Sequence, residues 1–141
     1  MQRDELKIVI GVHRLANDID RRTSRLLLDY DLTLGQFAVL ECLFHKGDLS
    51  VGEVQEKILS SSGTIPVIIR NLEKRKLIAR IQDIADKRRF ILHLTDKGKE
   101  LIEKAYPENE RMIFNSLDIY TEEEKATLVA LLKKYKEKGN E

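Results

Sequence analysis

Apolar residues along this chain follow two spacings, and each spacing predicts a different kind of element. Recurrence every three or four positions indicates one face of an amphipathic helix, whereas alternation with polar residues indicates a strand with one buried face. The first spacing covers residues 4–30, 33–47 and 95–138. Alternating or β-branched segments lie at Ile78–Ile81 and Phe90–Leu94, on either side of a charge-dense loop. The pattern predicts a mainly α-helical chain with a small β-hairpin, an α+β fold.

Residues able to start or stop a helix lie where the helical spacing begins or ends. A serine or threonine at the N-cap accepts a hydrogen bond from a backbone N–H of the first turn, and a glutamate three residues later can return one. The residues that fit these positions are Thr33, Ser50 with Glu53, Thr95, and Thr121 with Glu124. Gly47 is expected to end the second helix. Pro107 is expected to kink or interrupt the helix that follows Thr95.

Two short helical segments near the middle of the chain are typical of a helix-turn-helix motif. The first starts at Ser50, and the second lies within "SSSGTIPVIIRNLEKRK", residues 60–76. Its apolar face is formed by Ile65, Ile68, Ile69 and Leu72. A β-hairpin directly after a helix-turn-helix is a wing. We therefore interpret residues 33–94 as a winged helix-turn-helix lobe.

The helices at the two ends carry more apolar surface than so small a lobe can cover. We expect residues 4–30 and 95–138 to pack against a second copy of the same chain, as dimerisation helices. A length of 141 residues suits one domain, so residues 1–141 are interpreted as a single unit that forms a homodimer.

Charge is balanced over the whole chain but not along it. The formal net charge is +1, yet between residues 70 and 89 eight cations stand against three acids, which makes this the candidate anion-binding face. One cysteine, Cys42, excludes an intramolecular disulfide. No apolar run is long enough for a secretory signal or a membrane span, so we expect no membrane partner and a cytoplasmic location.

Five segments resemble the MarR family of winged-helix transcription regulators: "LTLGQFAVLECL", "LSVGEV", "TIPVIIRNLEKRKLIAR", "DIADKRR" and "LTDKGKEL". The resemblance implies a sequence-specific DNA-binding regulator, most often a repressor, that binds a pseudo-palindromic operator as a homodimer. It also implies that the recognition helices enter successive major grooves, that the wings reach the flanking minor grooves, and that a small-molecule effector can bind. Similar proteins have glycine where this chain has Lys76, and usually in the turn occupied by Leu59 and Ser60.

The second short helix supplies most of the predicted DNA contacts. Its candidate residues are Ser61, Ser62, Thr64, Pro66, Val67, Arg70 and Lys74. Hydroxyl groups at the helix start can bond phosphates or base edges. Pro66 costs little in the first turn, and with Val67 it can contact the thymine methyl, the apolar feature of the major groove. Arg70 suits bidentate guanine recognition, and Lys74 suits a phosphate.

The hairpin tip supplies the remaining predicted contacts. The family's Asp-x-Arg motif corresponds to Asp86, Lys87 and Arg88, which implies that Asp86 orients Arg88 for insertion into the minor groove. An arginine there reads groove width rather than base identity. Lys87 and Arg89 add charge at the tip. Arg80 either contacts phosphate or braces the wing, and the sequence does not separate these roles.

Other reactive side chains point less clearly to a site. The resemblance implies an effector pocket between the dimer helices and the lobe, for which His13, Tyr30 and Phe37 are candidate lining residues, although ordinary core packing fits them better. Cys42 lies among apolar residues, which favours a packed thiol over a redox sensor. Cys42 and His45 share a helix but lack enough further ligands for a metal, so no metal or cofactor is expected.

No catalytic motif appears in the sequence, and we expect no enzymatic activity. The competing interpretation is a winged-helix module that binds a protein partner and has a solvated basic face. The apolar Pro66 and Val67 keep that interpretation open.

Overall fold

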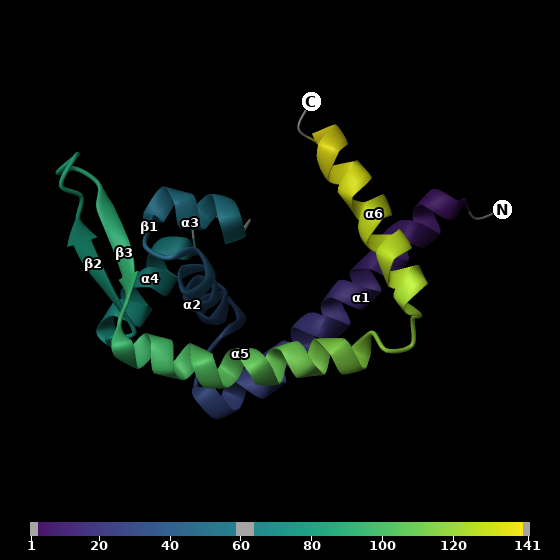
Figure 1. Ribbon diagram of the computed structural model, residues 1–141, viewed down its shortest axis with the longest axis horizontal. Helices are drawn as coiled ribbons and strands as arrows, with labels where there is room; N and C mark the ends of the chain where they lie inside the picture. Colours follow the sequence, from purple (N-terminus) through teal and green to yellow (C-terminus); the bar gives the residue numbers. More distant parts are fainter. Residues whose placement is uncertain (1–2, 59–63, 140–141) are drawn as a thin grey trace.

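The computed structural model describes residues 3–58 and 64–139. Its elements, in chain order, are α1 (Asp4–Leu27), a 3-10 turn η1 (Leu28–Tyr30), α2 (Leu34–Lys46), β1 (Leu49–Ser50), α3 (Val51–Ile58), α4 (Ile65–Lys74), β2 (Ile78–Gln82), β3 (Phe90–Leu94), α5 (Asp96–Ser116) and α6 (Glu122–Gly139). The predicted fold class, mainly helical with a β-hairpin wing, is confirmed. Figure 1 shows the hairpin projecting at one end of the molecule and α6 at the other, with α5 running between them.

The helix starts lie at the predicted capping residues. Ser50 and Glu53 exchange two hydrogen bonds of 3.2 and 3.1 Å, and Thr121 and Glu124 exchange two of 3.1 and 2.9 Å. Thr95 Oγ1 accepts from the Gly98 N–H at 3.1 Å. Each bond satisfies a backbone or side-chain group that the first helical turn leaves without a partner. The caps therefore explain where α3, α5 and α6 begin.

The hairpin belongs to a three-stranded antiparallel sheet of order β1-β3-β2. Ile78 pairs with Leu94, and Leu49 pairs with Leu92. The sequence did not predict β1, because two residues are too few to show alternation. This short strand places the start of α3 beside the wing.

Of the two effects predicted for Pro107, a kink or an interruption, the interruption is wrong, because α5 is continuous from Asp96 to Ser116 with Pro107 inside it. Proline lacks the N–H that would bond the carbonyl four residues earlier, so it weakens the helix locally. Buried contacts on both sides hold the helix together: Ile102 and Ala105 before the proline, and Asn109 after it. Asn109 Oδ1 accepts a buried hydrogen bond of 2.8 Å from Thr23 Oγ1 of α1.

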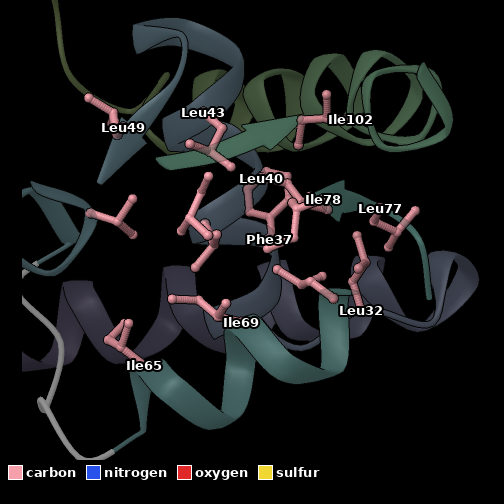
Figure 2. Packing of buried hydrophobic residues seen from close by; sticks show 14 of the residues in the cluster. Leu32, Phe37, Leu40, Leu43, Leu49, Ile65, Ile69, Leu77, Ile78 and Ile102 are labelled. Carbon is pink, nitrogen blue, oxygen red and sulfur yellow. The ribbon is translucent and has the colours of Figure 1, made fainter. Parts of the chain in front are cut away.

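The core of the winged lobe fills the space between α2, α4, the sheet and the start of α5. Figure 2 shows Leu40 at the centre of this cluster, between Ile69 of α4 and Ile102 of α5. Leu40, Ile69 and Leu92 are at most 1% exposed. Packing of this kind fixes α4 relative to the base of the wing.

The terminal helices are far less covered. Large apolar residues in the first half of α1 and along α6 are exposed, among them Leu6, Ile8, Val9, Leu128, Leu131, Leu132 and Tyr135. No α6 side chain that the structure describes is buried. In the described part of the chain, no helix is long and apolar enough to cross a membrane.

Candidate nucleic-acid interface

Helix α4 presents the predicted two-sided character. Ile65, Ile69 and Leu72 are buried against the lobe, whereas Val67 and Arg70 are exposed on the opposite side. Pro66, Lys74 and Asn71 are exposed as well, and sequence reasoning had not singled out Asn71. The amphipathic spacing is thus confirmed, and α4 lies on the lobe surface with its basic side outward.

Pro66 is the second residue of α4, which begins after Thr64. A backbone N–H at that position has no partner within the helix, so proline removes nothing there. Ser61 and Ser62, predicted as DNA contacts, lie outside the described residues. Thr64 is exposed at the helix start.

The other end of α4 terminates at a lysine in a left-handed conformation, at the position where the resemblance to MarR proteins leads us to expect glycine. Lys76 has φ 61°. Its N–H donates to the Glu73 carbonyl at 2.9 Å, and the Leu77 N–H donates to the Leu72 carbonyl at 3.0 Å. These are the two bonds of a Schellman motif. Thr95 Oγ1 donates to the Lys76 carbonyl at 2.7 Å, so this turn is attached to the start of α5.

The wing tip holds Arg88 outward. Arg88 Nε donates to Asp86 Oδ1 at 3.2 Å, and the Arg88 backbone N–H donates to the same oxygen at 3.1 Å. The Arg88 side chain is nevertheless 92% exposed. These two donors, the guanidinium first, lower the pKa of Asp86, so the carboxylate is ionised at neutral pH. The geometry fits a carboxylate that orients an accessible arginine.

Two other arginines of the wing are engaged with acids of the helix-turn-helix. Arg89 Nη2 donates to Glu53 Oε1 of α3 at 2.7 Å, and its Nε lies 3.8 Å from Asp83 Oδ2. Arg80 Nη2 donates to Glu73 Oε1 of α4 at 2.8 Å, and its guanidinium lies 5.3 Å from the centre of the Phe90 ring. Of the two roles predicted for Arg80, this arrangement favours bracing.

The predicted DNA-binding cations therefore divide into two groups. Within the described ranges, Arg70, Lys74 and Lys87 form no ion pair, and Arg88 pairs only with its neighbour Asp86. Arg80 and Arg89 are held by acids on other elements. Sequence reasoning had found Glu53 only as a cap, because its arginine partner is 36 positions away.

The three candidate effector residues occupy different environments. Phe37 is buried in the core, Tyr30 is half-buried against it, and His13 is exposed on α1. The Tyr30 hydroxyl donates a hydrogen bond to the Glu108 carboxylate, which raises the pKa of the Tyr30 phenol. The single chain does not bring His13 together with the other two.

A separate hollow of about 620 Å³ lies between α2, α3 and α6. Cys42, His45, Lys57 and Lys136 are among its lining residues. Burial raises the pKa of the Cys42 thiol, although nearby Lys57 and Lys46 act in the opposite direction. Among the described residues, no three His, Cys, Asp or Glu side chains are placed to hold a metal ion.

Comparison with known proteins defines the class. The family model described as transcriptional regulator SarA/Rot matches residues 22–105. The chain is 30% identical over 134 residues to the HTH-type transcriptional regulator MhqR of Bacillus subtilis (strain 168), which covers 95% of this chain and 92% of MhqR.

Solved structures agree with that assignment. A MarR family protein from Bacillus stearothermophilus matches with a TM-score of 0.76 and 25% identity, covering 100% of this chain and 99% of that protein. S. aureus MepR, solved in complex with DNA, matches with a TM-score of 0.82 and 25% identity, covering 92% and 95% of the two chains.

The fold, the exposed basic side of α4 and these similarities define a winged helix-turn-helix transcriptional regulator that binds DNA. The chain belongs to the SarA/Rot family of transcriptional regulators. The resemblance to MarR proteins predicted from the sequence is confirmed. Membership in this family favours the DNA-binding interpretation over a module that binds only proteins.

Proposed function

We propose that this chain is a homodimeric repressor that binds a pseudo-palindromic DNA site through α4 and the wing. The observation that carries the proposal is the common exposure of Arg70 and Lys74 on α4 and of Lys87 and Arg88 on the wing. Two neighbouring elements thus present accessible cations: Arg70, Lys74 and Lys87 form no ion pair among the described residues, and Arg88 pairs only with Asp86. Neutralising phosphates releases condensed counterions, which favours binding to a duplex.

Helix α4 would enter the major groove, where base identity is read. Arg70 would bond guanine, and Lys74 a phosphate further along. Pro66 and Val67 form an apolar leading edge that suits thymine methyl groups. Replacing thymine by uracil at the contacted positions should weaken binding, and an unchanged affinity at every position would contradict this role.

The wing would place Arg88 in the adjacent minor groove, with Asp86 limiting the conformations of its guanidinium. A narrow minor groove concentrates negative potential, which attracts an inserted arginine. Because Arg88 is already oriented before binding, less conformational entropy is lost when the complex forms.

A second copy of the chain is the partner that suits the exposed terminal helices. Leu128, Leu131, Leu132 and Tyr135 recur at positions i, i+3, i+4 and i+7 and form one face of α6. Contiguous apolar faces of this kind mark interaction surfaces, and symmetric pairing is the commonest solution. The two recognition helices would then lie about 34–36 Å apart, one helical turn of DNA.

A small-molecule effector is the remaining part of the proposal. It would bind at the junction between the terminal helices and the winged lobe, where the hollow containing His45 and Lys136 lies. His13, Tyr30 and Phe37 stay as candidates that require the second copy to complete a pocket.

Selection of bound genomic fragments, followed by footprinting of the purified protein, tests the function. We expect a pseudo-palindromic site and an affinity that falls steeply with salt. Arg88→Ala should bind more weakly, and the slope of its log affinity against log salt concentration should be smaller in magnitude by about one. Deleting the gene should raise transcription from promoters that contain the site. No binding to any fragment at low salt, or unchanged affinity in Arg88→Ala, would contradict the proposal.

A further inference from the structure

Two acids sit within the basic surface of the helix-turn-helix, where simple electrostatics makes them unfavourable for DNA binding. Glu53 lies in the first turn of α3, and Glu73 lies near the end of α4. Each carboxylate faces an arginine of the wing: Arg80 lies in β2, and Arg89 directly precedes β3. We define Glu53–Arg89 and Glu73–Arg80 as the two wing pairs.

The first wing pair joins the start of α3 to the strand β3 side of the wing. Glu53 Oε1 accepts from the Ser50 backbone N–H at 3.1 Å and from Arg89 Nη2 at 2.7 Å. Hydrogen bonds from Ser50, aided by the Arg89 charge, lower the pKa of Glu53, so it is ionised at neutral pH. The same carboxylate therefore caps α3 and holds a wing residue that is adjacent to Arg88.

The second wing pair joins α4 to strand β2. Glu73 Oε1 accepts from both Arg80 Nη2, at 2.8 Å, and Arg80 Nε, at 3.3 Å. The Arg80 guanidinium also lies over the Phe90 ring of β3, 5.3 Å from its centre, within the range of a cation–π contact. The acid, the guanidinium and the ring thus connect the recognition helix to both long strands.

We propose that Glu53 and Glu73 are positioning residues that raise DNA affinity by fixing the wing against α3 and α4. Arg80 and Arg89 then act through these acids, and Lys87 and Arg88 are the wing cations that contact DNA. The proposal rests on the proposed DNA-binding function and assigns new roles within the same surface. A β-hairpin attached only at its base moves relative to α4, and ordering it on binding costs affinity.

The two explanations of these acids predict opposite changes in DNA affinity when the negative charge is removed. An acid that is only a surface charge repels the phosphates, so removing its charge strengthens binding. A positioning acid has the opposite effect, because its removal lets the wing move. Glutamine suits the test because it keeps the size of the side chain and, at Glu53, the capping acceptor.

The experiment measures affinity for the selected operator by fluorescence anisotropy for the Glu53→Gln and Glu73→Gln variants and for their combination. We expect each single variant to bind about twofold to fivefold more weakly, the range an exposed ion pair can supply. Thermal midpoints should stay close to that of the wild type. Glu56→Gln is the matched control, because Glu56 is exposed on α3 and has no ion pair among the described residues; it should bind as tightly as the wild type or more tightly.

A double-mutant cycle separates positioning from direct contact. Arg89→Gln should weaken binding alone but add little when Glu53 is already glutamine. Tighter binding by Glu53→Gln and Glu73→Gln, or fully independent losses in the cycle, would overturn this inference while leaving the proposed function intact. Absence of operator binding by the wild type would instead overturn the proposed function and, with it, this inference.

Discussion

The winged lobe and the terminal helices contain similar apolar residues, yet they differ in where those residues find partners. In the lobe, Leu40 and Leu92 are fully buried by other parts of the same chain. On α6, Leu132 is 53% exposed and Tyr135 is 78% exposed. One chain thus completes the core of the DNA-binding lobe, whereas the apolar faces of the helices that carry it are exposed and, in the dimer that we propose, pack against a second chain. Stability should therefore have one part that is independent of protein concentration and one part that depends on it.

The largest expected effect is in the lobe. Leu40→Ala removes a fully buried side chain and leaves a cavity, so we expect it to lower the free energy of unfolding by about 2–5 kcal/mol. Denaturant titration measures this, and the loss should be the same at low and high protein concentration. Leu28→Ala is the control, since Leu28 is 75% exposed and should change stability little. A similar loss in both variants would contradict the assignment of the core.

The next effect concerns α6. Leu132→Asp places a charge on the exposed apolar face, and we expect the dissociation constant of the dimer to rise by about a hundredfold. Sedimentation velocity over a concentration series measures the shift. Lys133→Asp places the same carboxylate on another side of α6, with an even larger change in net charge, and should leave association nearly unchanged. If both variants associate equally, the apolar face of α6 is not the interface.

A smaller effect is expected within the terminal helices, at the buried contact between α1 and α5. Thr23→Val deletes the hydroxyl that donates to Asn109 in the buried contact between α1 and α5. We expect a loss of about 1–2 kcal/mol, because the Asn109 oxygen is left without its buried donor. Thr127→Val is the matched control, because that exposed hydroxyl bonds the Glu123 carbonyl and water can replace it. Equal losses of unfolding free energy in the two variants, measured by chemical denaturation, would show that burial of the Thr23–Asn109 hydrogen bond adds no stability.

The smallest effect is a gain in stability at the end of α4. Lys76→Gly relieves a left-handed lysine at φ 61°, and we expect stability to rise by about 0.5–1 kcal/mol. Asp31→Gly, at the other non-glycine position of positive φ that the described residues contain, should gain less, because aspartate tolerates this conformation. Thermal unfolding of the two variants tests the difference. A loss of stability in Lys76→Gly would mean that the lysine side chain contributes more than its backbone costs.

Local signals made much of the fold predictable. Ser50 with Glu53 and Thr121 with Glu124 define helix starts within four residues, so no tertiary information was needed. Strand β1 was missed because its stability comes from pairing with β3, which lies some 40 positions later in the chain. The interruption predicted at Pro107 was wrong because the local cost of proline in a helix is offset by packing that only the folded chain supplies.

The sequence predicts which cations belong to the candidate site, but it does not predict which of them stay accessible and which are held by acids on other elements. Arg88 and Arg89 were predicted to contact DNA, whereas the sequence left open whether Arg80 contacts phosphate or braces the wing. The structure separates them by their partners: Glu73 for Arg80, Asp86 for Arg88 and Glu53 for Arg89. Only the Asp86 partner is close enough in sequence to be recognised as a motif.

We propose that each winged lobe is complete within one chain, and that two lobes are paired on DNA by terminal helices whose apolar faces only a second chain covers. Sedimentation equilibrium of the protein with a DNA fragment carrying one selected operator tests it most directly. We expect two 16.4 kDa chains on each fragment, and weaker binding by Leu132→Asp at the same site. Saturation by a single chain, with the affinity unchanged in Leu132→Asp, would contradict it.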